Sequence, residues 1–371
     1  MPPRSGDPGM TVGHLGTVTD SAPVDAALRD FFAERRAEAR ELGDDFAALV
    51  AELESYVLRG GKRIRPAFAW LGWIGAGGDP EDPVAGAVLN ACAGFELLHA
   101  SGLIHDDIID ASQTRRGHPA AHVAYAERHR ARRFSGDPGT FGTGTAILIG
   151  DLVLIWADVL VRASGLPADA HVRVSPVWSA VRSEVMYGQL LDLISQVSRS
   201  EDVDAALRIN QYKTASYTVE RPLQFGAAIA GADDDLFAAY RAFGADVGIA
   251  FQLRDDLLGV FGDPVVTGKP SGDDLREGKR TVLLATALKR ADERDPDAAA
   301  YLRAKVGTDL ADEEIARIRG IFRDVGAVEE IERQISLRTD RALAALEASS
   351  ATAPAKHQLA DMAIKATQRA Q

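Results

Sequence analysis

The sequence has 371 residues, of which 46% are hydrophobic and 26% are charged, and its formal net charge is −12. This composition can fill a large core and excludes a chain that is disordered as a whole. The negative charge argues against a general nucleic-acid-binding protein, because such proteins bind phosphates through many Lys and Arg side chains. The single cysteine, Cys92, cannot form an internal disulfide, which fits a cytoplasmic location.

Residues 1–24 are predicted to be a flexible N-terminal segment. They are rich in Gly, Pro, Ser and Thr and lack the apolar core of a signal peptide. No transmembrane span is predicted, since the most apolar stretch, residues 146–161, is short and contains Asp151 and Asp158. We therefore expect one domain over residues 25–371.

Helical periodicity dominates the rest of the chain, and the alternation typical of strands is scarce. We expect a turn over residues 75–83, an exposed loop over 128–144 and a second long loop over 262–278, and such loops are often functional. These features indicate an all-α fold built as a single large helical domain. Helices are predicted over residues 26–58, 84–109, 146–164, 173–197, 203–230, 234–261, 279–291 and 313–349.

Three carboxylates, Asp106, Asp107 and Asp110, end the apolar helix predicted over residues 84–109. Asp106 and Asp110 are four residues apart and share one face of a helix. Carboxylates this close repel one another unless a cation lies among them, and hard oxygen ligands suit Mg²⁺. Taken alone, the cluster fits either a metal site or an acidic patch on the surface.

A second acidic pair, Asp255 and Asp256, lies near the end of the helix predicted over residues 234–261. If the two acidic motifs face each other, metal ions held between them can clamp a diphosphate and stabilise its charge as it leaves. The pairing of the motifs therefore favours the metal site over the surface patch.

Basic residues lie beside both acidic motifs, and Arg and Lys are the side chains that diphosphate oxygens require. His99 lies two turns before Asp106 on the same helical face, where it is either a core histidine or a site residue. The basic candidates are Lys62, Arg63 and Arg65 within GGKRIRP at residues 60–66, Arg115, Arg116, Lys213, Lys269 and Lys279.

In this order, the motifs resemble those of the polyprenyl synthetase family of trans-isoprenyl diphosphate synthases. The resemblance runs from about residue 58 to residue 287 and covers GGKRIRP, residues 96–118 around DDIID, Gly188-Gln189 with Asp192, Lys213-Thr214, FQLRDD and GKPSGDDLREGKRT. It implies a helical bundle around a deep central cavity, usually a homodimer. It also implies Mg²⁺-dependent, head-to-tail condensation of isopentenyl diphosphate with an allylic prenyl diphosphate.

The resemblance also implies a role for each matching residue. Asp106, Asp110 and Asp255 bind three Mg²⁺ ions, supported by Asp107 and Asp256. The allylic diphosphate is contacted by Arg115, Lys213 and Lys269, and isopentenyl diphosphate by Lys62, Arg65, His99 and Arg116. The cavity wall or the residues behind it include Gln189, Asp192, Thr214, Gln252 and Lys279.

One position departs from the family pattern, because Gly259 stands where the second motif usually has a third aspartate. Asp263, one turn further on, could compensate through water. We expect Asp255 to make the direct metal contact, so that activity survives.

Product length in this family is set by side chains just before the first motif. Ser101 and Gly102 are small here, and Gly102 lies one turn behind Asp106. A growing prenyl tail can pass them, so we expect geranylgeranyl diphosphate as the product, with Leu98 or a facing helix as the floor. A longer product remains open.

Three other functions compete with this interpretation. A non-catalytic partner subunit of a prenyltransferase is supported only by Gly259. A terpene cyclase would not need GGKRIRP and carries a different second metal motif. A His-Asp phosphohydrolase needs further histidines that the chain does not supply at suitable spacing.

Overall fold

The computed structural model describes residues 21–262 and 272–368, and this part of the chain is almost entirely helical, which confirms the all-α prediction. The strands β1 (Thr114–Arg115) and β2 (His118–Pro119) form a two-residue hairpin. The helices are α1 (Ala22–Leu42), α2 (Asp44–Leu58), α3 (Ile64–Gly75), α4 (Ala85–Ile109), α5 (Ala121–Ala131), α6 (Pro138–Arg162), α7 (Ala168–Ser198), α8 (Val203–Ile209), the π-helix η1 (Asn210–Glu220), α9 (Arg221–Ala230), α10 (Asp234–Phe261), α12 (Asp273–Glu277), α13 (Val282–Arg294), α14 (Pro296–Lys305), α15 (Asp312–Asp324), α16 (Ala327–Ala348) and α17 (Ala353–Thr367).

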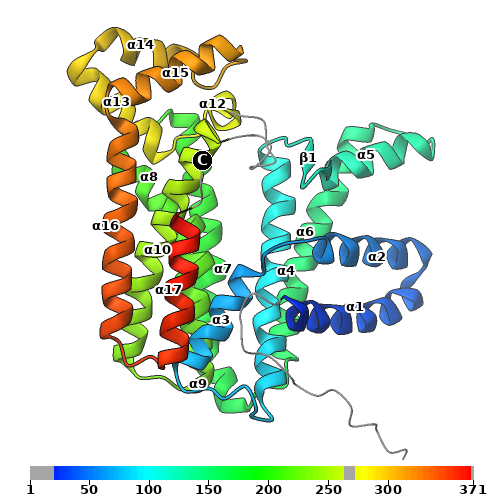
Figure 1. The fold of residues 1–371 in the computed structure, drawn as a ribbon. Coiled ribbons are helices and arrows are strands. Elements are labelled where there is room, and N and C mark those ends of the chain that lie inside the picture. Colours follow the sequence, from blue (N-terminus) through cyan, green and yellow to red (C-terminus); the bar gives the residue numbers. More distant parts are fainter. Residues whose placement is uncertain (1–20, 263–271, 369–371) are drawn as a thin grey trace, which may run out of the picture.

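The long helices form a bundle whose ends carry the shorter ones (Figure 1). Helix α4 packs most extensively on α6, and α10 packs on α16 and η1. Helices α1, α2 and α5 project to one side, while α13, α14 and α15 cap one end of the bundle. The last helix, α17, returns to lie against α3 and α16. Residues at the ends of α4 and α10 are thereby placed at the same level of the bundle.

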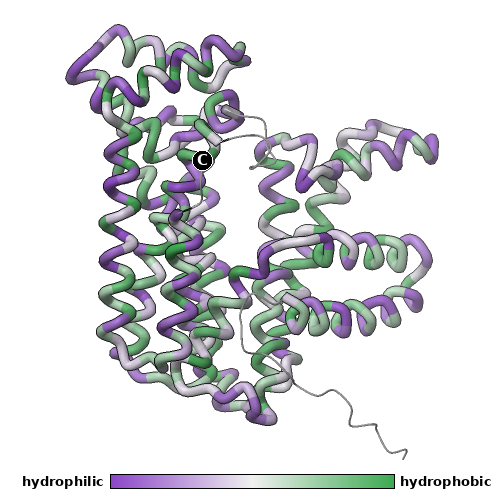
Figure 2. Tube along the Cα trace, viewed as in Figure 1, coloured by the Kyte–Doolittle hydropathy of each residue, from purple (hydrophilic) through white to green (hydrophobic). Residues whose placement is uncertain are grey.

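Three clusters of buried apolar side chains hold the bundle together. The first joins α1–α7 to α9, the second joins α10 to α13–α16, and the third joins α3, α9 and α10 to α16 and α17. Helix α4 is hydrophobic along most of its length (Figure 2) and packs on several neighbours at once. Each fully buried large apolar side chain stabilises the fold by about 1.5–3 kcal/mol.

Three predicted helices are divided in the structure. The helix predicted over residues 26–58 breaks at Gly43, whose φ of 128° ends α1, and the one over 313–349 breaks at Gly326, whose φ is 75°. The helix predicted over residues 203–230 becomes α8, η1 and α9 in succession. Because π-helical stretches are often found at functional sites, η1 marks a region of interest.

The loop predicted over residues 128–144 is mostly wrong. Helix α5 continues to Ala131, and α6 begins at Pro138 after Asp137, whose side chain accepts a hydrogen bond of 2.6 Å from the Thr140 amide. Pro is well suited to the first helical position. A Cβ at Gly142 would lie 2.1 Å from the His122 carbonyl, so this glycine permits close packing of α6 on α5.

Residues 1–20 and 369–371 lie outside the described part, and α1 begins three residues before the predicted domain start at residue 25. Among the described helices, α4 and α6 are long and apolar enough to cross a membrane by length and composition. Buried residues make up 67% of that window in α4 and 44% in α6, and the two helices pack on each other inside the bundle.

Candidate active site

The first acidic motif lies where α4, α7 and η1 meet. Helix α7 approaches η1 closely because Gly188 has no side chain, since a Cβ there would lie 2.4 Å from the Lys213 backbone nitrogen. This contact places Gln189 and Asp192 beside Lys213. The three segments therefore meet around the end of α4.

Asp106 is the centre of this meeting point. Its Oδ1 accepts a hydrogen bond of 3.1 Å from Gln189 Nε2 and lies 3.4 Å from Lys213 Nζ. Lys213 also contacts Asp192 Oδ2 at 2.6 Å. Burial lowers the pKa of the Lys213 ammonium, but the negative charges of Asp106 and Asp192 outweigh it, so the net shift is upward. Lys213 is thus a positive charge held in place by two carboxylates.

The β1–β2 hairpin brings Arg115 to the same motif. Its turn is made by Arg116 and Gly117 with φ of 53° and 75°, which is typical of tight hairpins. Arg115 Nε donates a hydrogen bond of 2.8 Å to Asp107 Oδ1, and its Nη2 lies 3.9 Å from Asp106 Oδ2. Asp107 is fully buried, and burial raises its pKa despite this hydrogen bond.

Asp110 lies on the partly exposed side of the motif. Burial, and then the negative charge of Asp106, raises the pKa of Asp110 to about 6. The positive charges of Lys279 and Lys213 act in the opposite direction. A cation between Asp106 and Asp110 would relieve the repulsion that raises this pKa.

Mg²⁺ binding is expected to weaken as the pH falls through about 6, because Asp110 then takes up a proton that competes with the cation. For a single competing proton, the apparent dissociation constant should rise about fourfold between pH 7.5 and pH 5.5. Mg²⁺-induced thermal stabilisation, measured without substrate, tests this shift. Asp110→Asn should weaken Mg²⁺ binding and reduce its dependence on pH, and an equal dependence in that variant would refute the assignment.

The second acidic motif lies on α10, across from η1. Asp255 is exposed, whereas Asp256 is buried and accepts a hydrogen bond of 2.8 Å from Gln252 Nε2. Burial raises the pKa of Asp256 well above its usual value, and the charges of Asp274 and Asp255 add to this shift. Gln252 Oε1 in turn accepts a hydrogen bond of 2.8 Å from Thr214 Oγ1. Thr214 and Gln252 therefore link η1 to the second motif.

Lys279 lies in the loop before α13, and its positive charge acts to lower the pKa of both Asp110 and Asp256. Its Nζ lies 2.8 Å from Glu277 and 3.5 Å from Asp274. Burial lowers the pKa of Lys279, but the charges of Asp274 and Glu277 outweigh it and the net shift is upward, with Asp110 also contributing. Lys269 and Asp263 lie outside the described residues.

A second group of candidates gathers around Tyr217 of η1. His99 Nδ1 lies 3.1 Å from the Tyr217 hydroxyl, and the Arg65 guanidinium stacks 4.2 Å from the Tyr217 ring centroid. Arg65 Nη2 also donates a hydrogen bond of 3.1 Å to Thr218 Oγ1. Burial, followed by the charges of Arg65 and Arg116, holds the pKa of His99 well below its usual range. His99 is therefore neutral.

The GGKRIRP segment is anchored by Arg63, whose role as an anchor is not visible in the sequence. Arg63 is buried, and it contacts Glu96 at 2.7 Å, Asp25 at 2.8 Å and the Val57 carbonyl at 2.9 Å. Arg116 Nη1 donates a hydrogen bond of 2.9 Å to the Gly60 carbonyl of the same segment. The loop that carries Lys62 is thus fixed against the hairpin that carries Arg115.

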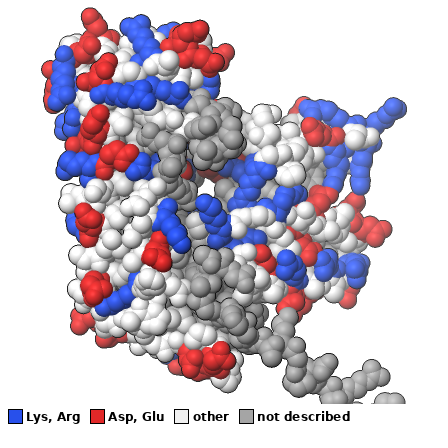
Figure 3. Space-filling model, viewed as in Figure 1, with Lys and Arg blue, Asp and Glu red and all other residues white. Residues whose placement is uncertain are grey.

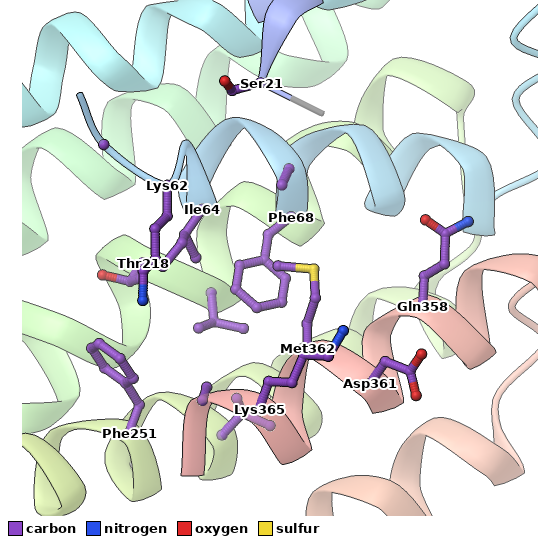
Figure 4. A pocket seen from close by; sticks show the side chains of 15 residues that line it. Ser21, Lys62, Ile64, Phe68, Thr218, Phe251, Gln358, Asp361, Met362 and Lys365 are labelled. Atoms are coloured by element: carbon purple, nitrogen blue, oxygen red, sulfur yellow. The ribbon is translucent and has the colours of Figure 1, made fainter. Parts of the chain in front are cut away.

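Lys62 lies at a cavity of about 560 Å³ between α3, η1, α10 and α17. Figure 4 shows Lys62 beside Thr218, with Phe251 on one side and Met362 and Lys365 of α17 opposite. In the space-filling view, basic side chains lie on both sides of a hollow near the middle of the visible face (Figure 3). Among the basic candidates, Lys62 lines this cavity.

Of the three residues expected to control product length, Gly102 faces open space. A Cβ at Gly102 would meet no atom within 4 Å, whereas Leu98 and Ser101 are 2% and 0% exposed. The structure thus singles out Gly102 as the position where a larger side chain would protrude.

Two tyrosines at the site were missed from sequence. Tyr217 follows Lys213 by four residues, and in a helical segment this spacing could have indicated that both side chains lie near the site. Tyr56 comes from α2, and burial together with the nearby Asp107 raises its pKa to about 12. No local motif marks Tyr56, because only the packing of α2 near the hairpin brings it there.

The carboxylates suit a hard cation, although no described group of three or more His, Cys, Asp or Glu side chains is close enough to form a complete metal site. Asp107 Oδ2 and Asp256 Oδ2 are buried without a hydrogen-bond partner, one in each motif. Mg²⁺ is usually held by only one or two carboxylates and completed by water and substrate phosphates, so an incomplete set of protein ligands is compatible with it.

The chain is similar to known proteins in both sequence and fold. A sequence model of the polyprenyl synthetase family matches residues 47–319. The geranylgeranyl diphosphate synthase of Mycobacterium tuberculosis is 33% identical over 77% of this chain and 75% of its own length. The geranylfarnesyl diphosphate synthase of Aeropyrum pernix is 32% identical over 76% and 82%, respectively.

A solved structure shares both the fold and much of the sequence. It is the geranylgeranyl pyrophosphate synthase of Corynebacterium glutamicum complexed with isoprenyl diphosphate and magnesium. The TM-score is 0.90 at 46% sequence identity, covering 95% of this chain and 99% of that one.

Proposed function

The chain belongs to the polyprenyl synthetase family and is a prenyltransferase, and from this premise we propose that it makes geranylgeranyl diphosphate from isopentenyl diphosphate and an allylic diphosphate. The observation that carries the product assignment is the open space at Gly102, one turn before Asp106. A cytoplasmic location is part of the proposal and is supported by the buried free thiol of Cys92.

Mg²⁺ is the proposed cofactor, with three ions per site, and when bound it neutralises the diphosphate and stabilises its charge as it leaves. Asp106, Asp110 and Asp255 would hold the ions, because they are the partly or fully exposed carboxylates of the two motifs. Asp107 and Asp256 are buried and would support them from behind.

The basic side chains form two groups, one assigned to each substrate. We assign Arg115 and Lys213 to the allylic diphosphate, since both lie beside Asp106. Lys269 has the same assignment by resemblance. The isopentenyl diphosphate is assigned to the group formed by Lys62, Arg65, His99 and Arg116 around the GGKRIRP loop. Thr214, Gln252 and Lys279 are assigned by resemblance to the cavity wall or to the residues behind it.

The residues act mainly by binding and by excluding water. The allylic carbon–oxygen bond breaks, giving diphosphate and an allylic cation. The double bond of isopentenyl diphosphate attacks this cation and forms the new carbon–carbon bond. A proton then leaves the condensed product for the released diphosphate. Water has to be kept out while the cation exists, because water would capture it in place of the double bond.

Isopentenyl incorporation with and without EDTA tests the activity. Elongated prenyl diphosphate that requires Mg²⁺ supports the proposal. Hydrocarbon products would indicate a cyclase, free alcohol or phosphate a hydrolase, and no turnover a partner subunit. A longer-chain synthase is the second candidate, favoured by the similarity to a geranylfarnesyl diphosphate synthase and by the space at Gly102.

We also propose that two copies form a homodimer through α6 and α7. Among the described residues, α6 and α7 carry most of the large exposed apolar side chains, and a subset of these is named the apolar face. Such a surface is typical of an interface between subunits. The apolar face comprises Ile147, Leu148, Ile155, Met186, Tyr187, Leu190, Ile194 and Val197.

Ile155→Asp is expected to dissociate this dimer. Ile155 is 59% exposed in the single chain, and a two-fold interface would bury two unpaired carboxylates. We expect dimer affinity to fall by about a hundredfold or more, measured by sedimentation. Leu337→Asp is the matched control, because Leu337 is 49% exposed on α16, away from the apolar face. A dimer unaffected by Ile155→Asp would place the interface elsewhere.

A further inference from the structure

The second acidic motif lacks a residue that the first one has. Asp110 follows Asp106 by four residues, and the corresponding position after Asp255 is Gly259. Residues four apart share one face of α10, so a side chain at position 259 would point the same way as Asp255. Helix α10 therefore supplies no side chain at this position of the motif.

The carboxylate of Asp274 fills this place. A Cβ at Gly259 would lie 1.9 Å from Asp274 Oδ2 and 2.7 Å from Asp274 Cγ, so the two side chains cannot occupy the same space. The backbone also joins the two segments, since the Gly272 amide donates a hydrogen bond of 3.2 Å to the Gly259 carbonyl. Asp274 thus reaches the motif from α12 rather than from α10.

The surroundings of Asp274 belong to the same site. Its Oδ1 lies 3.5 Å from Lys279 Nζ, and its side chain is 17% exposed. Its negative charge also acts on Asp256 of the second motif. We propose that Asp274 supplies the third carboxylate of the second motif, and that Gly259 is the positioning residue that leaves room for it.

This inference rests on the proposed function. If it holds, Gly259 does not indicate a defective metal site, because Asp274 replaces the missing aspartate. Adding even a methyl group at position 259 would push the Asp274 carboxylate away. Gly259→Ala and Asp274→Ala should therefore act through the same carboxylate, and their effects should not add.

The test is a double-mutant cycle read out as binding of inorganic diphosphate in the presence of Mg²⁺, by calorimetry. We expect Gly259→Ala and Asp274→Ala each to weaken binding by about tenfold or more, as for residues that support metal ligands. The double variant should bind no more weakly than Asp274→Ala. The swap Gly259→Asp with Asp274→Ala should recover binding, since it returns the carboxylate from α10.

The inference would be overturned by an additive cycle, or by a swap variant that binds diphosphate as weakly as Asp274→Ala. Gly320→Ala is the matched control, because Gly320 lies in α15 and a Cβ there meets nothing within 4 Å. Melting curves without Mg²⁺ show whether each variant is folded. If the wild-type protein elongates chains but the double-mutant cycle is additive, only this inference is wrong. If the wild-type protein does not elongate chains, the proposed function is wrong.

Discussion

Asp106→Asn is expected to lower kcat by about a thousandfold, the loss seen when a group that stabilises transition-state charge is removed. Asp106 is the residue that Gln189 and Lys213 both contact, and Arg115 lies within 3.9 Å of it. The amide keeps the shape of the carboxylate but loses the charge that Mg²⁺ requires. Steady-state isopentenyl incorporation at saturating Mg²⁺ measures the effect.

The matched control is Asp340→Asn on α16, an exposed aspartate far from the acidic motifs in sequence, which should leave kcat unchanged. Circular dichroism establishes that Asp106→Asn is folded. A folded Asp106→Asn variant with near-normal kcat would mean that the first motif does not hold the leaving diphosphate.

Gly102→Phe is expected to shorten the product from geranylgeranyl to farnesyl or geranyl diphosphate. No atom lies within 4 Å of a Cβ at this position, so a phenyl ring can extend into the space without displacing the core. Because the helix rises 1.5 Å per residue, position 102 lies about 6 Å along the helix axis from Asp106, on nearly the same face. Mass spectrometry of the products measures the change.

Gly86→Phe is the control for this substitution, since Gly86 lies on the same helix and its Cβ position is also open. It should leave the product length unchanged. If Gly102→Phe also leaves it unchanged while activity persists, the prenyl tail does not pass along this face of α4.

Sequence periodicity predicted the long helices well because their apolar faces repeat regularly. Helix α10 has the bounds that were expected, and α4 begins one residue later than expected. The loop predicted over residues 128–144 is mostly helical in the structure, and Gly142, one of the glycines behind that prediction, serves close helix packing. A glycine that permits contact and a glycine that breaks a helix look alike in one sequence.

The acidic and basic candidates could be found from sequence because each lies in a compact local motif. Arg63 was visible too, but its role as an anchor depends on Glu96 and Asp25, which are far away in the chain. For the same reason, the sequence alone shows Gly259 only as a missing aspartate in the second motif. Its counterpart, Asp274, lies 15 positions later and reaches it only through the packing of α12 on α10.

The most direct test of the account is the length of the product that the wild-type protein makes. Purified protein is incubated with Mg²⁺, isopentenyl diphosphate and either dimethylallyl, geranyl or farnesyl diphosphate, and the products are identified by mass spectrometry. The account predicts that geranylgeranyl diphosphate dominates from all three starters. A dominant product of another length would contradict the geranylgeranyl assignment, and no elongation from any starter would contradict the proposed synthase activity.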